Sequence, residues 1–439
     1  MKSKKISCLG VYNENIAENK AFFSFTKSFL KSRLNVPYIY NIHENQQYYL
    51  IEDLGDLSLK QELDNLGSSS SDSKKKAGYY KQAIKDLIKF QLTEENKIDY
   101  SLCFPRDRFD KQSILWDLNH FKYFFVKLSG ISFDEQALEN DFQEIAENLS
   151  RVSNSFFLFR DFQSRNIMIS NEKLYYIDYQ GGRKGALQYD VASLLFEAKT
   201  NLSDNFRKEM LEFYIDELSN NSNIHREDFL KDFYGFVFIR ILQALGSYGL
   251  RGWVEKKALF LQSVPYALKN LKWLHENTLI PNAYSELNRI VKNLYSNEKL
   301  YRYAPANKEK LTILIQSFSY RNQLPDDLTG NGGGFIFDCR GINNPGKYPE
   351  LKEYTGKDSI IAKFFLEKSE MTSFLDDIKS IISRSVKQYN LEGYKHLQLS
   401  FGCTGGRHRS VFAAEKIKQY LEQNSDVIVE LSHRDLSYD

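Results

Sequence analysis

The sequence predicts an α+β protein with a large, mostly helical first region and a small α/β second region. Strand-like apolar runs are short and clustered in the first region, whereas strands and helices alternate regularly after residue 311. The chain of 439 residues is about three times the usual length of one domain. We therefore expect domains at 1–296 and 311–439, joined by a polar linker at 297–310 that contains one proline.

The apolar periodicity and the turn residues between the runs place each expected element. In the first region we expect a strand at 6–12, a helix at 15–33, strands at 37–43 and 48–53, helices to about 149, three short strands between 156 and 178, and helices again to about 295. In the second region we expect strands at 311–318, 334–338, 396–401 and 427–431 and helices near 358–366, 370–389 and 409–422.

One low-complexity stretch, GSSSSDSKKKAG at 67–78, stands between helical patterns. Its side chains are too polar to be buried, because transferring so many charged and hydroxyl groups out of water would be unfavourable. We therefore expect a mobile surface loop there.

The overall composition is that of an ordinary globular protein. Lys and Arg number 59 and Asp and Glu 57, so the net charge of +2 predicts no global attraction to nucleic acid. The four cysteines include no CxxC pair, which excludes a disulfide framework or a zinc site. The amino-terminal sequence does not resemble a signal peptide, and no apolar run approaches about 18 residues. We expect a cytoplasmic protein without membrane contact.

A first group of polar residues follows two of the short strands in the middle of the chain. Phe159-Arg160-Asp161 and Asn166 match the H-R-D-x-x-x-x-N pattern of kinase catalytic loops, with Phe in place of His. Asp178 follows twelve residues after Asn166, at the end of another strand. Phosphoryl transfer needs a carboxylate to hold the acceptor hydroxyl and further oxygen ligands for Mg²⁺. A loop and a hairpin would bring these groups together.

Residues 6 to about 290 resemble the aminoglycoside-phosphotransferase-like kinases, and FRDFQSRNIMI, LYYIDYQ and QYDVASLL most resemble the sugar kinases of N-acetylmuramate and N-acetylglucosamine. The resemblance implies a protein-kinase-like fold with a largely helical carboxyl-terminal lobe and a truncated amino-terminal lobe. It implies ATP and Mg²⁺ as cofactors, Asp161 as catalytic base, and Asn166 and Asp178 as magnesium ligands. We group Arg160 with the catalytic residues, and we expect Arg160 or Arg165 to steady the loop or the phosphates. It also places the adenine against the backbone of Glu52, Asp53 and Leu54, and makes Asp190 structural.

The amino-terminal part departs from this family. Relatives carry a phosphate-covering loop and a strand lysine before the helix that we expect from Asn15 onward, but fourteen residues precede it here, with no glycine-rich loop and no lysine in the strand at 6–12. Glu18 therefore has no evident lysine partner. Either the chain begins late relative to its relatives or nucleotide binding is weakened. Gln163 replaces a common histidine, a change that affects neither the base nor the metal ligands.

A second group of residues, Gly402 to Ser410 (GCTGGRHRS), links an expected strand to an expected helix. Glycines in such a link let backbone N–H groups converge at the positive end of the helix dipole, which favours an anion. Arg407, His408 and Arg409 strengthen this prediction. The same residues hold the Cys-x5-Arg-Ser spacing of cysteine phosphatases, at Cys403 and Arg409. Gly402 replaces the histidine that usually precedes that cysteine, so phosphatase activity is the weaker alternative.

Residues 311–439 resemble the RapZ carboxyl-terminal domain through FIFDCR (335–340), PELKEYTGKD (349–358), GCTGGRHRSV (402–411) and SHRDL (432–436), in that order. In that family the domain senses an amino-sugar phosphate and binds small RNA. The pocket expected from the resemblance and the motif comprises Arg321, Asp338, Cys403, Thr404, Gly405, Gly406, Arg407, His408, Arg409 and Ser410. Gly346 replaces a family histidine, which removes one contact. The domain holds 16 Lys and Arg against 17 Asp and Glu, a balance that argues against RNA as a partner without excluding it.

Two functional hypotheses follow. The first is a sugar kinase, acting on a small-molecule hydroxyl such as that of N-acetylmuramate or N-acetylglucosamine, fused to a domain that binds a sugar phosphate as effector. The second is a non-catalytic regulator with a degenerate kinase scaffold and a domain that binds sugar phosphate or RNA. The sequence predicts neither the hydroxyl that is phosphorylated nor the oligomeric state.

Overall fold

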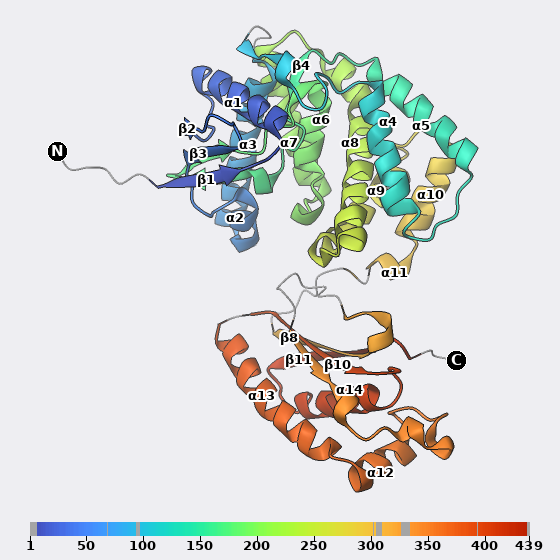
Figure 1. Cartoon of the computed structure of the whole chain (residues 1–439). Coiled ribbons are helices and arrows are strands. Elements are labelled where there is room, and N and C mark those ends of the chain that lie inside the picture. The colour runs from blue at the N-terminus through green and yellow to red at the C-terminus, as the bar shows by residue number, and fades with distance from the viewer. Residues whose placement is uncertain are drawn as a thin grey trace, which may run out of the picture. The chain divides into compact units, whose positions relative to one another are not determined.

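The computed structural model describes residues 7–67, 69–93, 97–301, 303, 310–325, 334–392 and 394–436. The chain forms two compact units (Figure 1). The first unit comprises Met1–Leu250 and Ser263–Arg302, and the second comprises Arg251–Gln262 and Tyr303–Asp439. The sequence did not predict that the short segment Arg251–Gln262 would group with the second unit. The predicted α+β architecture, a largely helical part followed by an α/β part, is confirmed.

The first unit is mostly helical, with three small sheets. Its strands are β1 Cys8–Tyr12, β2 Ile39–Ile42, β3 Tyr48–Glu52, β4 Phe156–Leu158, β5 Ile167–Ser170, β6 Lys173–Tyr176 and β7 Arg183–Gly185. Its α-helices are α1 Ile16–Lys31, α2 Leu59–Asn65, α3 Ser70–Gln91, α4 Lys111–Phe121, α5 Glu135–Ser150, α6 Leu187–Leu195, α7 Asp204–Asn221, α8 Arg226–Gly249, α9 Val264–Glu276, α10 Ser285–Tyr295 and α11 Glu298–Tyr301.

The amino-terminal strands form an antiparallel sheet in the order β1-β3-β2, beside α1. Helix α1 begins where predicted, because the side chain of Asn15 accepts a hydrogen bond from the backbone N–H of Glu18. Its buried face carries Phe22, Phe25 and Phe29, which meet aromatic rings of the middle strands. This aromatic packing attaches α1 to the part of the unit that carries the Arg160-Asp161 motif.

The predicted mobile loop at 67–78 is wrong, because α3 begins at Ser70 and includes most of this stretch. The Oγ atom of Ser69 accepts a hydrogen bond of 3.1 Å from the N–H of Asp72, which caps the helix. Lys75 forms an ion pair with Glu62 of α2. The hydroxyl and charged side chains are exposed on the first turns of a helix whose later turns are buried. The polarity of the stretch indicated exposure to solvent and not the absence of a helix.

Helix α8 is the core helix of the first unit and packs against α4, α6 and α9. It continues as a π-helix from Leu250 to Val254. The whole stretch Arg226–Val254 has a mean hydropathy of 1.2 over its most apolar window, and its 29 residues are enough to cross a membrane. Because 61% of that window is buried inside the protein, the same values suit a core helix. The expectation of no membrane contact therefore stays a prediction.

The second unit is a four-stranded parallel sheet covered by helices, in the strand order β11-β8-β10-β9. The strands and helices predicted here are confirmed to within a few residues at their ends. The apolar core lies between this sheet and the helices, with Ile315, Phe401 and Phe412 among its buried members. The elements are β8 Leu311–Ser319, β9 Phe335–Asp338, α12 Ser359–Lys368, α13 Met371–Leu391, β10 His396–Cys403, α14 Arg409–Leu421 and β11 Val427–His433.

The cap of α3 can be tested by substitution. We expect Ser69→Ala to lower the free energy of unfolding by about 1 kcal/mol, because the N–H of Asp72 loses its acceptor. Ser71→Ala is the matched control, since Ser71 is exposed inside the helix and alanine is the better helix former. Urea unfolding of the full chain measures both. Equal effects of the two substitutions would contradict the cap.

Candidate functional site

The Arg160-Asp161 motif lies on the loop between β4 and β5. A side chain of α6 binds the backbone of this loop. The carboxylate of Asp190 in α6 accepts hydrogen bonds from the N–H of Phe159 (2.7 Å) and the N–H of Arg160 (3.0 Å). Arg160 has a φ of +83°, a conformation that is unfavourable for a residue with a Cβ. Further along, Glu197 accepts a hydrogen bond of 2.8 Å from the N–H of Ser164. Two acidic side chains, the buried Asp190 and the half-buried Glu197, therefore fix the path of the loop.

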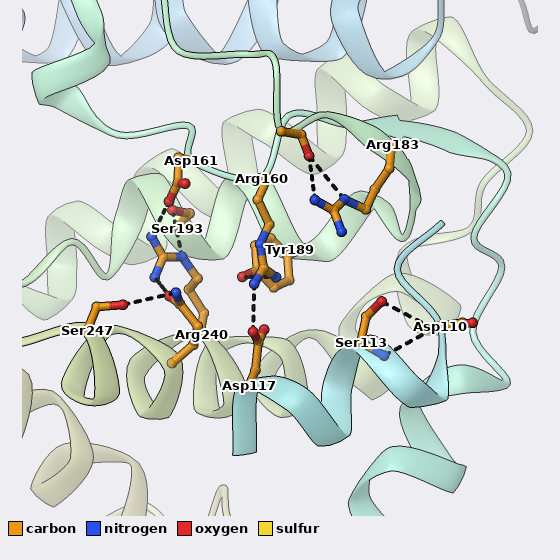
Figure 2. A network of polar contacts seen from close by, with 12 residues as sticks. Asp110, Ser113, Asp117, Arg160, Asp161, Arg183, Tyr189, Ser193, Arg240 and Ser247 are labelled. Carbon is orange, nitrogen blue, oxygen red and sulfur yellow. Dashed lines mark hydrogen bonds and ion pairs between the residues drawn. The ribbon is translucent and has the colours of Figure 1, made fainter. Parts of the chain in front are cut away.

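The side chain of Arg160 also serves this anchoring. Its guanidinium is 2.6 Å from Asp117 Oδ1 in α4 and donates a hydrogen bond of 2.7 Å to the hydroxyl of Tyr189 in α6 (Figure 2). Both partners are buried. A guanidinium bound to Asp117 and Tyr189 agrees with the loop-steadying role expected for Arg160, and its grouping with the catalytic residues stays a prediction. Arg160 holds the loop in place.

Asp161, Asn166 and Asp178 are brought together, as the motif predicts. The Nδ2 atom of Asn166 donates to the backbone oxygen of Asp161 (2.9 Å) and to Oδ2 of Asp178 (3.1 Å). Gln180 donates to the other carboxylate oxygen of Asp178. Desolvation and, second, the carboxylate of Asp161 raise the pKa of Asp178 above its ordinary value, although the residue is exposed to solvent. The carboxylates of Asp161 and Asp178 are thus close enough to repel each other.

The Asp161 side chain forms one further contact that the motif does not predict. Its Oδ1 is 3.2 Å from Nη2 of Arg240, which lies in the middle of α8 (Figure 2). Arg240, Asp117 and Glu197 are the functional residues that sequence reasoning missed. The signal for two of them was a single charge inside an apolar helical run, FVFIRILQAL for Arg240 and ILWDL for Asp117, since a buried charge requires a partner.

The phenylalanine in place of the kinase histidine is accommodated by aromatic packing. The ring of Phe159 lies 5.5 Å from that of Phe90, 5.2 Å from that of Phe162 and 6.0 Å from that of Tyr179. Gln163, the other departure, is buried behind the loop. Both residues therefore contribute to the packing under the loop.

The predicted adenine-binding residues lie at the end of β3 and just after it. The carboxylate of Glu52 accepts a hydrogen bond from the N–H of Tyr38, and that of Asp53 accepts one from the N–H of Gly55. Leu54 is buried. A few residues later the oxygen of Leu57 accepts a hydrogen bond of 2.8 Å from the N–H of Ile169 in β5. The segment after β3 therefore runs beside the strand that follows Asn166.

The second predicted site lies at the carboxyl ends of the parallel strands. The loop from Thr404 to His408 joins β10 to α14, and Gly406 has a φ of +68° that favours glycine. A Cβ on Gly405 would meet nothing within 4 Å, so the loop is open on that side. The backbone oxygen of Thr404 accepts a hydrogen bond of 2.7 Å from Ser319 at the end of β8.

The three basic side chains of this loop are engaged by carbonyl oxygens. Arg407 donates to the oxygens of Glu353 and Tyr354, and Nε2 of His408 lies 3.2 Å from the oxygen of Leu351. Buried Arg409 donates from Nη1 to the oxygens of Arg340 (2.9 Å) and Ile342 (3.0 Å) and from Nη2 to Oγ1 of Thr404 (3.4 Å). Arg407 and His408 thus attach the loop to the 351–354 segment, and the expectation that the three residues strengthen an anion site stays a prediction.

The remaining predicted residues surround the loop. Cys403 and Ser410 are buried, with Sγ and Oγ 3.1 Å apart. A buried sulfur disfavours the phosphatase alternative, because the thiolate must reach a phosphate ester. Asp338 is paired with Arg340, whose guanidinium lies 3.9 Å from the ring centroid of Tyr320. Arg321 is exposed just after β8.

The raised pKa of Asp190 predicts that the protein becomes less stable as the pH rises. Burial raises the pKa of Asp190 to about 7, although two backbone N–H groups oppose the rise. A carboxyl group with a native pKa above its unfolded value of about 3.9 stabilises the native state less as the pH rises from about 4 to about 7. We expect the free energy of unfolding of the wild type to fall by about 2 kcal/mol, relative to that of Asp190→Asn, between pH 5 and pH 8.

The measurement is urea unfolding of both proteins at the two pH values. Asp190→Asn should be less stable at both, because its amide nitrogen faces one of the two N–H donors. Parallel pH profiles for the two proteins would show that Asp190 does not titrate in this window.

Among solved structures, several kinases are similar to this chain at a distance. An ethanolamine kinase of Plasmodium vivax has a TM-score of 0.45 at 15% identity, covering 65% of this chain and 79% of its own. A choline kinase of Cryptosporidium parvum has a TM-score of 0.41 at 12% identity, covering 65% and 86%. A glucosamine kinase has a TM-score of 0.41 at 10% identity, covering 62% and 74%. Likenesses this distant carry no argument for function, which rests on the geometry of the site.

Curated relatives are more similar over a shorter stretch. A nucleotide-binding protein of Geobacter metallireducens is 37% identical over 131 residues, which are 30% of this chain and 44% of that protein. One of Thermosipho africanus is 34% identical over 139 residues, 32% of this chain and 47% of that protein. The chain thus spans less than half the length of these relatives. Residues 311–437 match the family of RapZ C-terminal domains, which confirms the resemblance inferred for this part of the chain.

Proposed function

We propose that the first unit is an ATP-dependent phosphotransferase that acts on a hydroxyl of an amino sugar such as N-acetylmuramate or N-acetylglucosamine. The second unit then binds an amino-sugar phosphate. The observation that carries the proposal is the contact of Asn166 Nδ2 with both Asp161 and Asp178. The contact supports the proposal because phosphoryl transfer requires a base close to the residues that hold the metal ion.

In this proposal Asp161 accepts a hydrogen bond from the sugar hydroxyl and takes its proton. The hydroxyl oxygen bonds to the γ-phosphorus of ATP while the bond from that phosphorus to the β,γ-bridging oxygen breaks, and ADP leaves. Its backbone oxygen is held by Asn166 and its neighbour Arg160 is held by Asp117, so the carboxylate is positioned before the substrate arrives. The backbone of residues 52–54 supplies hydrogen-bonding groups to the adenine. The segment that follows joins this region to β5, which keeps both ligand regions in one unit.

Asn166 and Asp178 are the residues that would hold Mg²⁺. Within the described residues no cluster of three or more His, Cys, Asp or Glu side chains could hold a metal ion by itself. Mg²⁺ bound to a nucleotide needs only one or two protein oxygens, because phosphates and waters supply the rest. Asn166 already lies 3.1 Å from Oδ2 of Asp178, so an amide and a carboxylate are adjacent at this position. When bound, the ion neutralises charge on the phosphates.

A non-catalytic regulator remains the second candidate, and the composition of β1 favours it. β1 has the sequence CLGVY and therefore carries no lysine that could contact phosphates. Glu18 of α1, the acidic residue expected to pair with such a lysine, instead accepts a hydrogen bond from Asn13 at 3.2 Å. Binding of ATP without turnover of any acceptor would support this candidate.

Substitution of the proposed base tests the enzyme claim. We expect Asp161→Asn to lower kcat about 100-fold or more, because an amide cannot take the proton. ATP consumption with N-acetylmuramate, N-acetylglucosamine and other sugar acceptors measures it. Asp228→Asn, on the exposed first turn of α8, is the control and should be fully active. Failure of the wild type to turn over any acceptor at high ATP would contradict the proposal.

The ligand of the second unit can be tested separately by calorimetric titration of the full chain with glucosamine 6-phosphate. We expect Thr404→Val to weaken binding about tenfold, because a hydroxyl on the open side of the loop can hydrogen-bond the phosphate. Thr372→Val, an exposed threonine of α13, should bind like the wild type. Equal affinity of the two variants would remove Thr404 from the site, and inorganic phosphate shows whether the sugar contributes.

A further inference from the structure

Arg240 is a buried charge in the centre of α8, and only 6% of its side chain is exposed. Its neighbours in the helix are apolar, in the run FVFIRILQAL. Burying a guanidinium is unfavourable unless its donors and its charge are both satisfied. Its Nε donates to Oγ of Ser193 at 3.1 Å, its Nη1 donates to Gln243, and its Nη2 is 3.2 Å from Oδ1 of Asp161 (Figure 2).

Asp161 compensates the positive charge of Arg240. Ser193 and Gln243 satisfy donors but are neutral, and Gln243 is itself oriented by a hydrogen bond to Ser247. In the ranges that the structure describes, Asp161 is the carboxylate within ion-pair distance of Arg240. The pair is unequal, because Arg240 is enclosed whereas 40% of the Asp161 side chain is exposed. Arg240 is therefore the fixed member of the pair and Asp161 the member that a ligand can reach.

Arg240 is the side chain that holds the Asp161 carboxylate. Arg160 is adjacent in the chain, but its guanidinium is committed to Asp117 and Tyr189. Asn166 contacts the backbone oxygen of Asp161 and not its carboxylate. Among the described residues, the carboxylate is therefore held by Arg240.

We propose that Arg240 is a positioning residue for the proposed phosphoryl transfer: it binds Oδ1 of Asp161 and so presents Oδ2 to the acceptor hydroxyl. Oδ2 accepts no hydrogen bond from any residue the structure describes, and it is therefore the oxygen available to a substrate. The inference rests on the proposed function, since positioning matters only if a reaction occurs. Phosphoryl transfer relies mainly on alignment, so a small displacement of the base would be costly.

Kinetics of two Arg240 variants test this role. We expect Arg240→Gln to lower kcat about 10-fold to 100-fold with a KM for ATP within about twofold of the wild type, because the nucleotide contacts are elsewhere. Arg240→Lys keeps the charge and should recover part of the loss. Arg207→Gln is the matched control: Arg207 is also buried, but it is paired with Asp204 and Asn270. It should lower the melting temperature and leave kcat unchanged.

A second measurement does not depend on turnover. Introduced into the wild type, Asp161→Asn should lower the melting temperature, since it leaves a buried guanidinium uncompensated. Introduced into Arg240→Gln, the same substitution should leave the melting temperature unchanged. Additive effects would overturn the inference, as would an unchanged kcat in both Arg240 variants. If the two substitutions have non-additive effects on the melting temperature but the wild type phosphorylates no acceptor, the proposed function is overturned instead. Arg240 would then be a structural residue that holds Asp161.

Discussion

The first site depends on the hydrogen bonds that Asp190 accepts from the backbone of Phe159 and Arg160. A left-handed conformation at a residue with a Cβ costs on the order of 1 kcal/mol, and it persists only where its surroundings determine it. Asp190, which lies on the buried helix α6, keeps Arg160 in this conformation through its two hydrogen bonds. Because the turn at Arg160 is fixed, the next residue, Asp161, leaves the loop in a defined direction, and Asn166 can reach both its backbone and Asp178.

Each predicted site contains an arginine whose guanidinium binds groups of the protein itself. Arg160 binds Asp117 and Tyr189 in the first unit, and Arg409 binds two carbonyl oxygens in the second. Arg160 comes just after β4, and Arg409 begins α14. These contacts make the two loops more rigid, which the proposed catalysis by alignment and the proposed anion binding both require.

The sequence predicted those features of the fold that depend on local pattern. The strands and helices of the second unit, helix α1, and the convergence of Asp161, Asn166 and Asp178 all followed from apolar periodicity and motif spacing. The helix at Ser70 was missed because its first turns are exposed. Polar residues there indicate contact with solvent and do not show whether the backbone is helical. Arg240 was missed for another reason: it pairs with Asp161 across 79 residues, and no local pattern encodes which distant charge a buried charge will meet.

The commitment of Arg407, His408 and Arg409 to carbonyl oxygens changes how the second unit can recognise an anion. The guanidinium groups of Arg407 and Arg409 keep their charge and add to the positive potential of the backbone N–H groups and the start of α14, but their donors bound to carbonyl oxygens are not free to contact a phosphate. Under the proposed function, selection among sugar phosphates comes from exposed side chains at the neighbouring strand ends. Arg321 follows β8, and the exposed pair of Asp338 and Arg340 follows β9. An exposed ion pair is weak, so the pair can open to bind sugar hydroxyls where a buried arginine could not.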